Sequence, residues 1–137
     1  AFGIFRIPTV AACHALMMSP IPNKFPELRW GFIEASAGWV PWVITEAKNR
    51  YQGAGRKFPD NVMKEYNIYV TCQTDDDVPY ILQCAGEDNI VIGTDYGHFD
   101  PSSEVDAISV LKEQGTLSES AMTKILRDNP KAMYGLS

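Results

Sequence analysis

The chain has 137 residues, of which 45% are hydrophobic and 21% charged, with a formal net charge of −5. Acidic residues outnumber basic ones and the basic ones do not cluster, which excludes recognition of nucleic acid or an anionic membrane through a basic surface. No apolar run approaches the roughly 18 residues of a membrane span. The composition is that of an ordinary globular protein.

Three cysteines, Cys13, Cys72 and Cys84, form an odd set without CxxC spacing. This pattern favours reduced, mostly buried thiols over a zinc site, and we expect a cytoplasmic protein. The apolar N-terminal segment has neither a basic start nor a small-residue cleavage site.

Helices and strands alternate along the chain. The pattern predicts a helix over 10–18, ended by Ser19-Pro20, a strand over 28–34 and a helix over 39–51. A short helix over 61–66 leads into a strand over 68–72, which is rich in β-branched and aromatic residues. This alternation is typical of an α/β protein with a parallel sheet.

A helix is expected over 76–84, with Asp75, Asp76 and Asp77 at its positive end. We interpret this acidic triplet as a solvated helix start rather than a metal cage. The next element is a short apolar strand over 90–92.

Two further helices are predicted near the C-terminus. The first opens at Ser103, with Asp106 as its capping-box partner, and the second begins near Ser118 and ends at Asn129-Pro130. Their apolar stripes are predicted to consist of Val105, Ile108 and Leu111, and of Met122, Ile125 and Leu126.

Asp95 follows the 90–92 strand directly. The strand has no polar alternation, which suits a strand buried on both faces. Catalytic groups of α/β sheets lie beyond the carboxyl ends of the strands, so a carboxylate here is a candidate site residue. The alternative is a turn or N-cap aspartate, because Gly, Asp and Pro are frequent up to residue 102.

The sequence around Asp95 resembles a known family. Residues 93–98 (GTDYGH) resemble the last-strand motif of the amidohydrolase superfamily, and its aminocarboxymuconate-semialdehyde decarboxylase-like branch in particular. Residues 24–34 (KFPELRWGFIE) resemble the approach to the sixth barrel strand, 38–41 (GWVP) the turn after it and 129–136 (NPKAMYGL) the C-terminal ending.

The resemblance implies the C-terminal half of a (β/α)8 TIM-type barrel, because a complete barrel needs about 250 residues. Residues 1–137 would then be part of a single barrel domain. We expect an N-terminal half to complete it, in the same polypeptide or as a separate subunit, and the assembly to be an oligomer. The chain begins without Met, which suggests a cleavage product or one segment of a longer polypeptide.

The resemblance also implies a divalent metal, zinc in the first place, with manganese or another divalent ion as the alternative. Asp95 would be a metal ligand and catalytic residue, while histidines of the first and fifth strands would come from the other half. The implied reaction is hydrolysis or decarboxylation of a small carboxylated or aromatic-type substrate.

Glu34 stands where many members of this family carry a histidine, at the end of the sixth strand. It could serve as a base or ligand facing the pocket, or form an ion pair at the strand end. His98, three residues after Asp95, could act as an acid in the pocket or stabilise its own loop.

His14 falls inside a predicted helix, which favours packing over metal binding. Trp39, Trp42 and Tyr96 could line a pocket for a planar substrate or belong to the core. A second functional hypothesis also stands: a structural subunit or degenerate barrel half that supports a catalytic partner.

Overall fold

The computed structural model describes residues 2–96 and 104–136, whose strands form one parallel sheet. Strands β1 (Trp30–Phe32), β2 (Ile68–Cys72) and β3 (Ile90–Ile92) pair in chain order. The predictions for 68–72 and 90–92 are confirmed. The first strand is shorter than predicted, because the chain leaves the extended conformation soon after Phe32 and Glu34 has φ of 61°.

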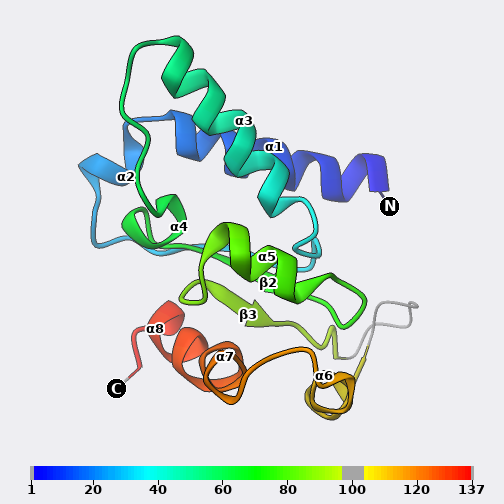
Figure 1. Ribbon diagram of the computed structural model, residues 1–137. Helices are drawn as coiled ribbons and strands as arrows, with labels where there is room; N and C mark the ends of the chain where they lie inside the picture. Colours follow the sequence, from blue (N-terminus) through cyan, green and yellow to red (C-terminus); the bar gives the residue numbers. More distant parts are fainter. Residues whose placement is uncertain (1, 97–103, 137) are drawn as a thin grey trace.

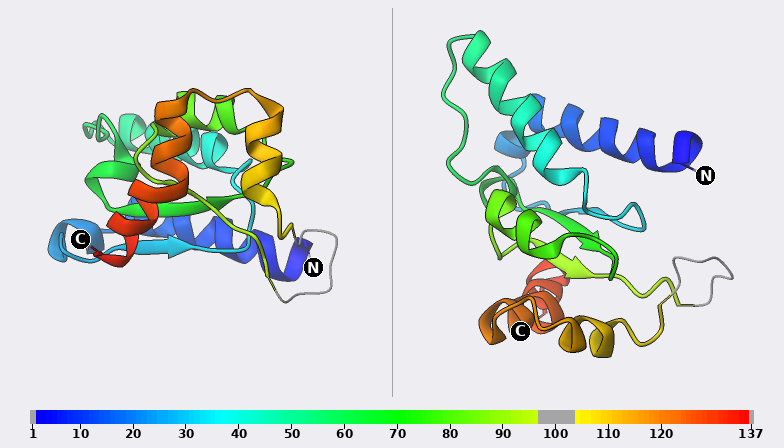
Figure 2. Two further views of the ribbon diagram at one scale, coloured as in Figure 1. Left: turned by 90° about the horizontal axis from the view of Figure 1, so that it is seen from below. Right: turned by 45° about the vertical axis from the view of Figure 1, so that its right-hand side comes forward.

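The helices connect and flank these strands. They are η1 (Phe2–Arg6), a π-helical turn, α1 (Ile7–Met18), α2 (Ile21–Lys24), α3 (Val40–Gly53), α4 (Val62–Glu65), α5 (Val78–Ala85), α6 (Ala107–Gln114), α7 (Glu119–Thr123), the π-helical turn η2 (Lys124–Asp128) and α8 (Asn129–Tyr134). Figure 1 shows α1 and α3 at the top, α5 in the middle and α6–α8 at the bottom, and the right-hand view of Figure 2 keeps this order. None of the helices formed by the described residues is long and apolar enough to cross a membrane.

The two faces of the sheet carry different residues, because side chains alternate along a strand. One face joins the hydrophobic core shared with the helices and consists of Trp30, Phe32, Ile68, Val70, Cys72, Ile90 and Ile92. Gly31, Tyr69, Thr71 and Val91 alternate with these and form the other face. The side chain of Met133, from α8, fills the space that a Cβ at Gly31 would need.

Burial of the cysteines follows the prediction for two of the three. Cys13 and Cys72 are fully buried, whereas Cys84 is exposed on α5. Desolvation raises the pKa of the Cys13 thiol to about 12. The same cause, with a smaller contribution from the charge of Asp76, raises the pKa of Cys72 to about 12.

The predicted helix end at Asn129-Pro130 is wrong. The chain stays helical through η2 into α8, and Pro130 lies in the first turn of α8, where the hydrogen-bonding pattern changes after the π-helical turn. Asn129 is buried, and its Nδ2 donates to the carbonyl oxygens of Glu87 and Ile90, both at 2.7 Å. The predicted start near Ser118 is confirmed, since its Oγ accepts a hydrogen bond from the N–H of Ala121 at 3.1 Å.

The helix predicted to open at Ser103 begins at Ala107 instead, and Ser103 itself lies outside the described residues. Asp106 precedes the first turn without a capping side-chain bond. The predicted stripe is wrong for Val105 and Ile108, which are exposed. With the helix starting at 107, the buried side chains are Ala107 and Leu111, which are one turn apart.

Candidate functional site

The carboxyl ends of the three strands border a cavity of about 200 Å³. It opens over the sheet face that carries Thr71 and Val91, and α8 contributes one wall. The lining residues are Ile33, Glu34, Thr71, Gln73, Val91, Ile92, Gly93, Thr94, Asp95, Pro130, Met133 and Tyr134. Since this is the edge where parallel α/β sheets place their chemistry, the cavity is the candidate site.

Asp95 lies three residues after β3 and lines this cavity, as its sequence position suggested. Its side chain is partly buried and its φ is 50°, in the left-handed region. Aspartate adopts that conformation more readily than most residues with a Cβ, so the backbone at this position is little strained. Its place past the end of β3, at the cavity, makes Asp95 a functional candidate.

Glu34 lines the same cavity from the end of β1. Its residue is exposed, its φ is 61°, and its backbone N–H donates to Oγ1 of Thr71 at 3.1 Å. The fold therefore brings Glu34 and Asp95, which are far apart in sequence, to one cavity from strands on either side of β2.

Of the two histidines singled out from the sequence, the structure describes one. His98 falls outside the described residues. His14 lies on α1 and lines a separate cavity of about 250 Å³, together with Trp42 of α3. His14 is thus a helix residue, as predicted.

The aromatic residues proposed for the pocket do not line the strand-end cavity. Trp39 packs edge-on against Phe32, with ring centroids 6.3 Å apart, and Tyr96 is 81% exposed. Among the described residues, the aromatic side chain at the cavity is that of Tyr134 on α8, which the sequence pattern did not single out.

Sequence reasoning also missed Thr71 and Gln73, which follow from the position of β2 between the other two strands. Of the acidic triplet, Asp77 caps α5 by accepting from the N–H of Tyr80 at 3.2 Å, as a helix-start residue should. Asp76 has a different role, because its carboxylate binds two loops at the same sheet edge.

The donor set at the cavity was tested for a divalent metal. Within residues 2–96 and 104–136, no group of three or more His, Cys, Asp and Glu side chains could hold a metal ion. The carboxylates of Asp95 and Glu34 fit such an ion as two contributors to a larger donor set. Cys72 does not contribute, because its side chain belongs to the hydrophobic core on the other face of the sheet.

Parallel strands in chain order, helical connections and carboxylates at the strand ends are typical of part of a (β/α)8-type barrel. The family model described as "Amidohydrolase" matches residues 3–136, so the chain belongs to the amidohydrolase family. Among curated proteins none matches.

A solved structure supports the fold. The chain is similar to the crystal structure of amidohydrolase map2389c from Mycobacterium avium subsp. paratuberculosis K-10, with a TM-score of 0.73 and 24% sequence identity. The match covers 93% of this chain and 34% of that one. The chain thus spans about a third of the length of that amidohydrolase, and its α/β fold with parallel strands matches part of an amidohydrolase barrel.

Proposed function

We propose that this chain supplies the last-strand carboxylate, Asp95, to the site of a metal-dependent hydrolase or decarboxylase. The observation that carries the proposal is the position of Asp95, which lies past the end of β3 and shares the strand-end cavity with Glu34. We place the enzyme in the aminocarboxymuconate-semialdehyde decarboxylase-like branch, on the four motifs that resemble it. We infer from the same resemblance that its substrate is a small carboxylated or aromatic-type molecule.

Each carboxylate has a distinct task in this proposal. Asp95 holds the metal and, in hydrolysis, accepts a proton from the attacking water. Glu34 acts as base or additional ligand. Zinc, or manganese as the alternative, supplies Lewis-acid polarisation of the substrate when bound. In decarboxylation, His98 in protonated form delivers the proton to the carbon that loses CO2.

The remaining ligands come from an N-terminal barrel half, on the same polypeptide or on a separate subunit. Residues 1–137 are then the C-terminal portion of one barrel domain, and the complete cytoplasmic enzyme is an oligomer. The share of the solved amidohydrolase that this chain covers, 34%, supports a larger assembly.

A structural subunit without metal chemistry of its own is the second candidate. Glu34 favours it, since the resemblance expects a histidine at that strand end, and a carboxylate is anionic where an imidazole is neutral. In this case Asp95 would serve the loop conformation only.

The deciding experiment uses the complete assembly purified natively, with its metal content and its turnover measured before and after Asp95→Asn. Asparagine adopts the left-handed conformation as readily as aspartate, so the fold is retained. We expect the metal content to fall from about one equivalent towards zero and turnover to fall about 100- to 10,000-fold. Asp60→Asn, at a side chain 86% exposed, is the control and should change neither. Unchanged metal and turnover in Asp95→Asn would leave the structural-subunit candidate.

A further inference from the structure

The carboxylate of Asp76 joins the loops that follow β1 and β2. Its Oδ2 accepts from the N–H of Ala37 at 2.9 Å and from the N–H of Gln73 at 2.8 Å. Its Oδ1 accepts from the N–H of Gly38 at 3.0 Å and from the hydroxyl of Ser36. Four donors from two loops therefore converge on one side chain, which is more than a helix-start aspartate uses.

The sequence around Ser36 is fitted to this carboxylate. A Cβ at Gly38 would lie 3.2 Å from Oδ1 of Asp76, tighter than side chains normally pack, so glycine allows the backbone to approach. Ser36 has φ of 61°, a conformation that its bond to Asp76 compensates. The indole N–H of Trp39 donates to the carbonyl oxygens of Ala35 at 3.1 Å and Ser36 at 2.8 Å.

This bonded loop begins at Glu34. Upstream, the N–H of Glu34 is held by Thr71 Oγ1, and downstream the chain is held by Asp76 within four residues. The backbone of Glu34 is thus held on both sides in its left-handed conformation, and Glu34 lines the cavity. The second loop that Asp76 holds contributes Gln73 to the same cavity.

We infer that Asp76 is a positioning residue of the candidate site, which fixes the orientation of Glu34 towards the cavity by binding the loops after β1 and β2. The inference rests on the proposed function, because it gives Glu34 a task in the reaction. Asp76 itself does not line the cavity and touches no reacting group. Its partners lie 38 to 40 residues away on the β1 side, so it links two structural units rather than one turn.

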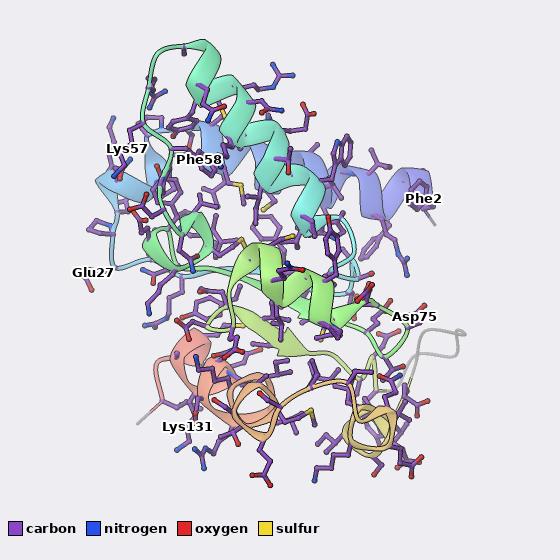
Figure 3. All side chains as sticks on the ribbon, in the orientation of Figure 1. Phe2, Glu27, Lys57, Phe58, Asp75 and Lys131 are labelled. Carbon is purple, nitrogen blue, oxygen red and sulfur yellow. The ribbon has the colours of Figure 1, made fainter. Side chains whose placement is uncertain are left out.

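Asp76→Asn in the complete assembly tests this positioning role, because it changes the hydrogen bonds to residue 76 with little change in side-chain size. The amide has one oxygen, so its NH2 group faces either the N–H groups of Ala37 and Gln73, with loss of two bonds, or the N–H of Gly38 and the hydroxyl of Ser36, with loss of the bond to Gly38 while Ser36 Oγ accepts from the NH2 group. We expect faster hydrogen exchange at the N–H groups of Ala37, Gly38 and Gln73. The matched control is Asp75→Asn, which removes the same charge from an exposed residue on the outside of the loop after β2 (Figure 3). In Asp75→Asn, these three N–H groups should exchange at the same rates as in the parent.

The functional arm measures the zinc dissociation constant and kcat, with Glu34→Gln as the second mutation of a cycle. Asp76→Asn should either raise the zinc dissociation constant or lower kcat by about 10- to 100-fold, as the loss of a supporting hydrogen bond does at metal sites. In the Glu34→Gln background, Asp76→Asn should cause no further loss, because a residue that acts through Glu34 has nothing left to position.

The outcomes separate this inference from the proposed function. Faster exchange with unchanged zinc affinity and kcat, or a full second loss in the double variant, would overturn the positioning role. If Asp95→Asn nevertheless loses zinc, the proposed function holds although the positioning role of Asp76 is rejected. Unchanged zinc binding and kcat in Asp95→Asn would reject both. If Asp76→Asn does not fold, Ser36→Ala removes one of the four bonds and decides the point by the same cycle, with a smaller, few-fold effect expected.

Discussion

At the end of the sheet where the strands begin, polar side chains are paired with one another or with the backbone, whereas at the end where the strands finish, carboxylates border a cavity. Buried Asn129 donates to two carbonyl groups that flank the start of β3, and Asp88 accepts from Lys64 and Lys124 at 2.8 Å each. Glu34 and Asp95 at the opposite end have left-handed backbones and line the cavity.

The difference lies in what the hydrogen bonds at each end of the sheet do. Bonds at the starting end lower the free energy of the folded chain and lie away from the cavity. At the finishing end, hydrogen bonds to Asp76 and Thr71 hold the loop that begins at Glu34, and Glu34 and Asp95 line the cavity. Substitutions at the two ends should therefore affect different quantities.

Asn129→Ala should give the largest loss of stability. It removes two short hydrogen bonds and leaves buried carbonyl groups of Glu87 and Ile90 without this donor, which costs about 2–4 kcal/mol in the free energy of unfolding. Urea denaturation measures this loss. Asn49→Ala, at an exposed position of α3, should change it by less than about 0.5 kcal/mol. An Asn129→Ala variant as stable as the parent would remove the distinction between the two ends.

Thr71→Val should have a smaller effect on stability, about 1 kcal/mol, because it removes only the acceptor for the N–H of Glu34 and keeps the side-chain shape. We expect faster hydrogen exchange at the backbone N–H of Glu34, measured by mass spectrometry or NMR. Thr45→Val, which removes a hydroxyl bonded to Pro41 within α3, is the control and should leave Glu34 unchanged. Unaltered exchange at Glu34 would contradict the anchoring of this loop.

Asp88 should give the smallest effect, seen in the pH dependence of stability. Hydrogen bonds from Lys124 and then Lys64 lower the pKa of Asp88 below its ordinary 3.8. Its contribution is therefore present above about pH 3.8 and is lost as the pH falls through the lower, folded-state pKa. The pairs are about a third to two-thirds exposed, so we expect less than about 1 kcal/mol.

The measurement is the free energy of unfolding of Asp88→Asn and of the parent between about pH 6 and pH 3. The variant should lose less stability than the parent at the acidic end of that range. Asp60→Asn, which removes an exposed ion pair with Lys57, should follow the parent curve. Identical curves for Asp88→Asn and the parent would show that the charges at this end contribute nothing.

Elements that depend on local composition could be predicted from the sequence. The β-branched runs of β2 and β3 gave the observed bounds, and a strand-end carboxylate was expected at the cavity, where Asp95 lies. The helix end predicted at Asn129-Pro130 is wrong because proline interrupts the interior of a helix but is tolerated in a first turn, and the dipeptide alone does not say which position it takes.

Long-range hydrogen bonds account for the remaining failures. Asp76 looks like its neighbours Asp75 and Asp77 in the sequence, and only the folded chain brings Ser36, 40 residues away, to its carboxylate. The early end of β1 has the same origin, since the conformation of Glu34 depends on Thr71 of the next strand. The local sequence pattern does not predict hydrogen-bond partners that lie so far apart in the chain.

The chain-order pairing of the three strands bears on synthesis at the ribosome. Each strand takes its hydrogen-bonding partner from the strand made just before it, so no segment must wait for a distant one to emerge. The loop to be closed at each step is that of a single βα unit, which keeps its entropy cost small. The sheet can therefore grow strand by strand during translation, each new strand covering the edge of the one before it.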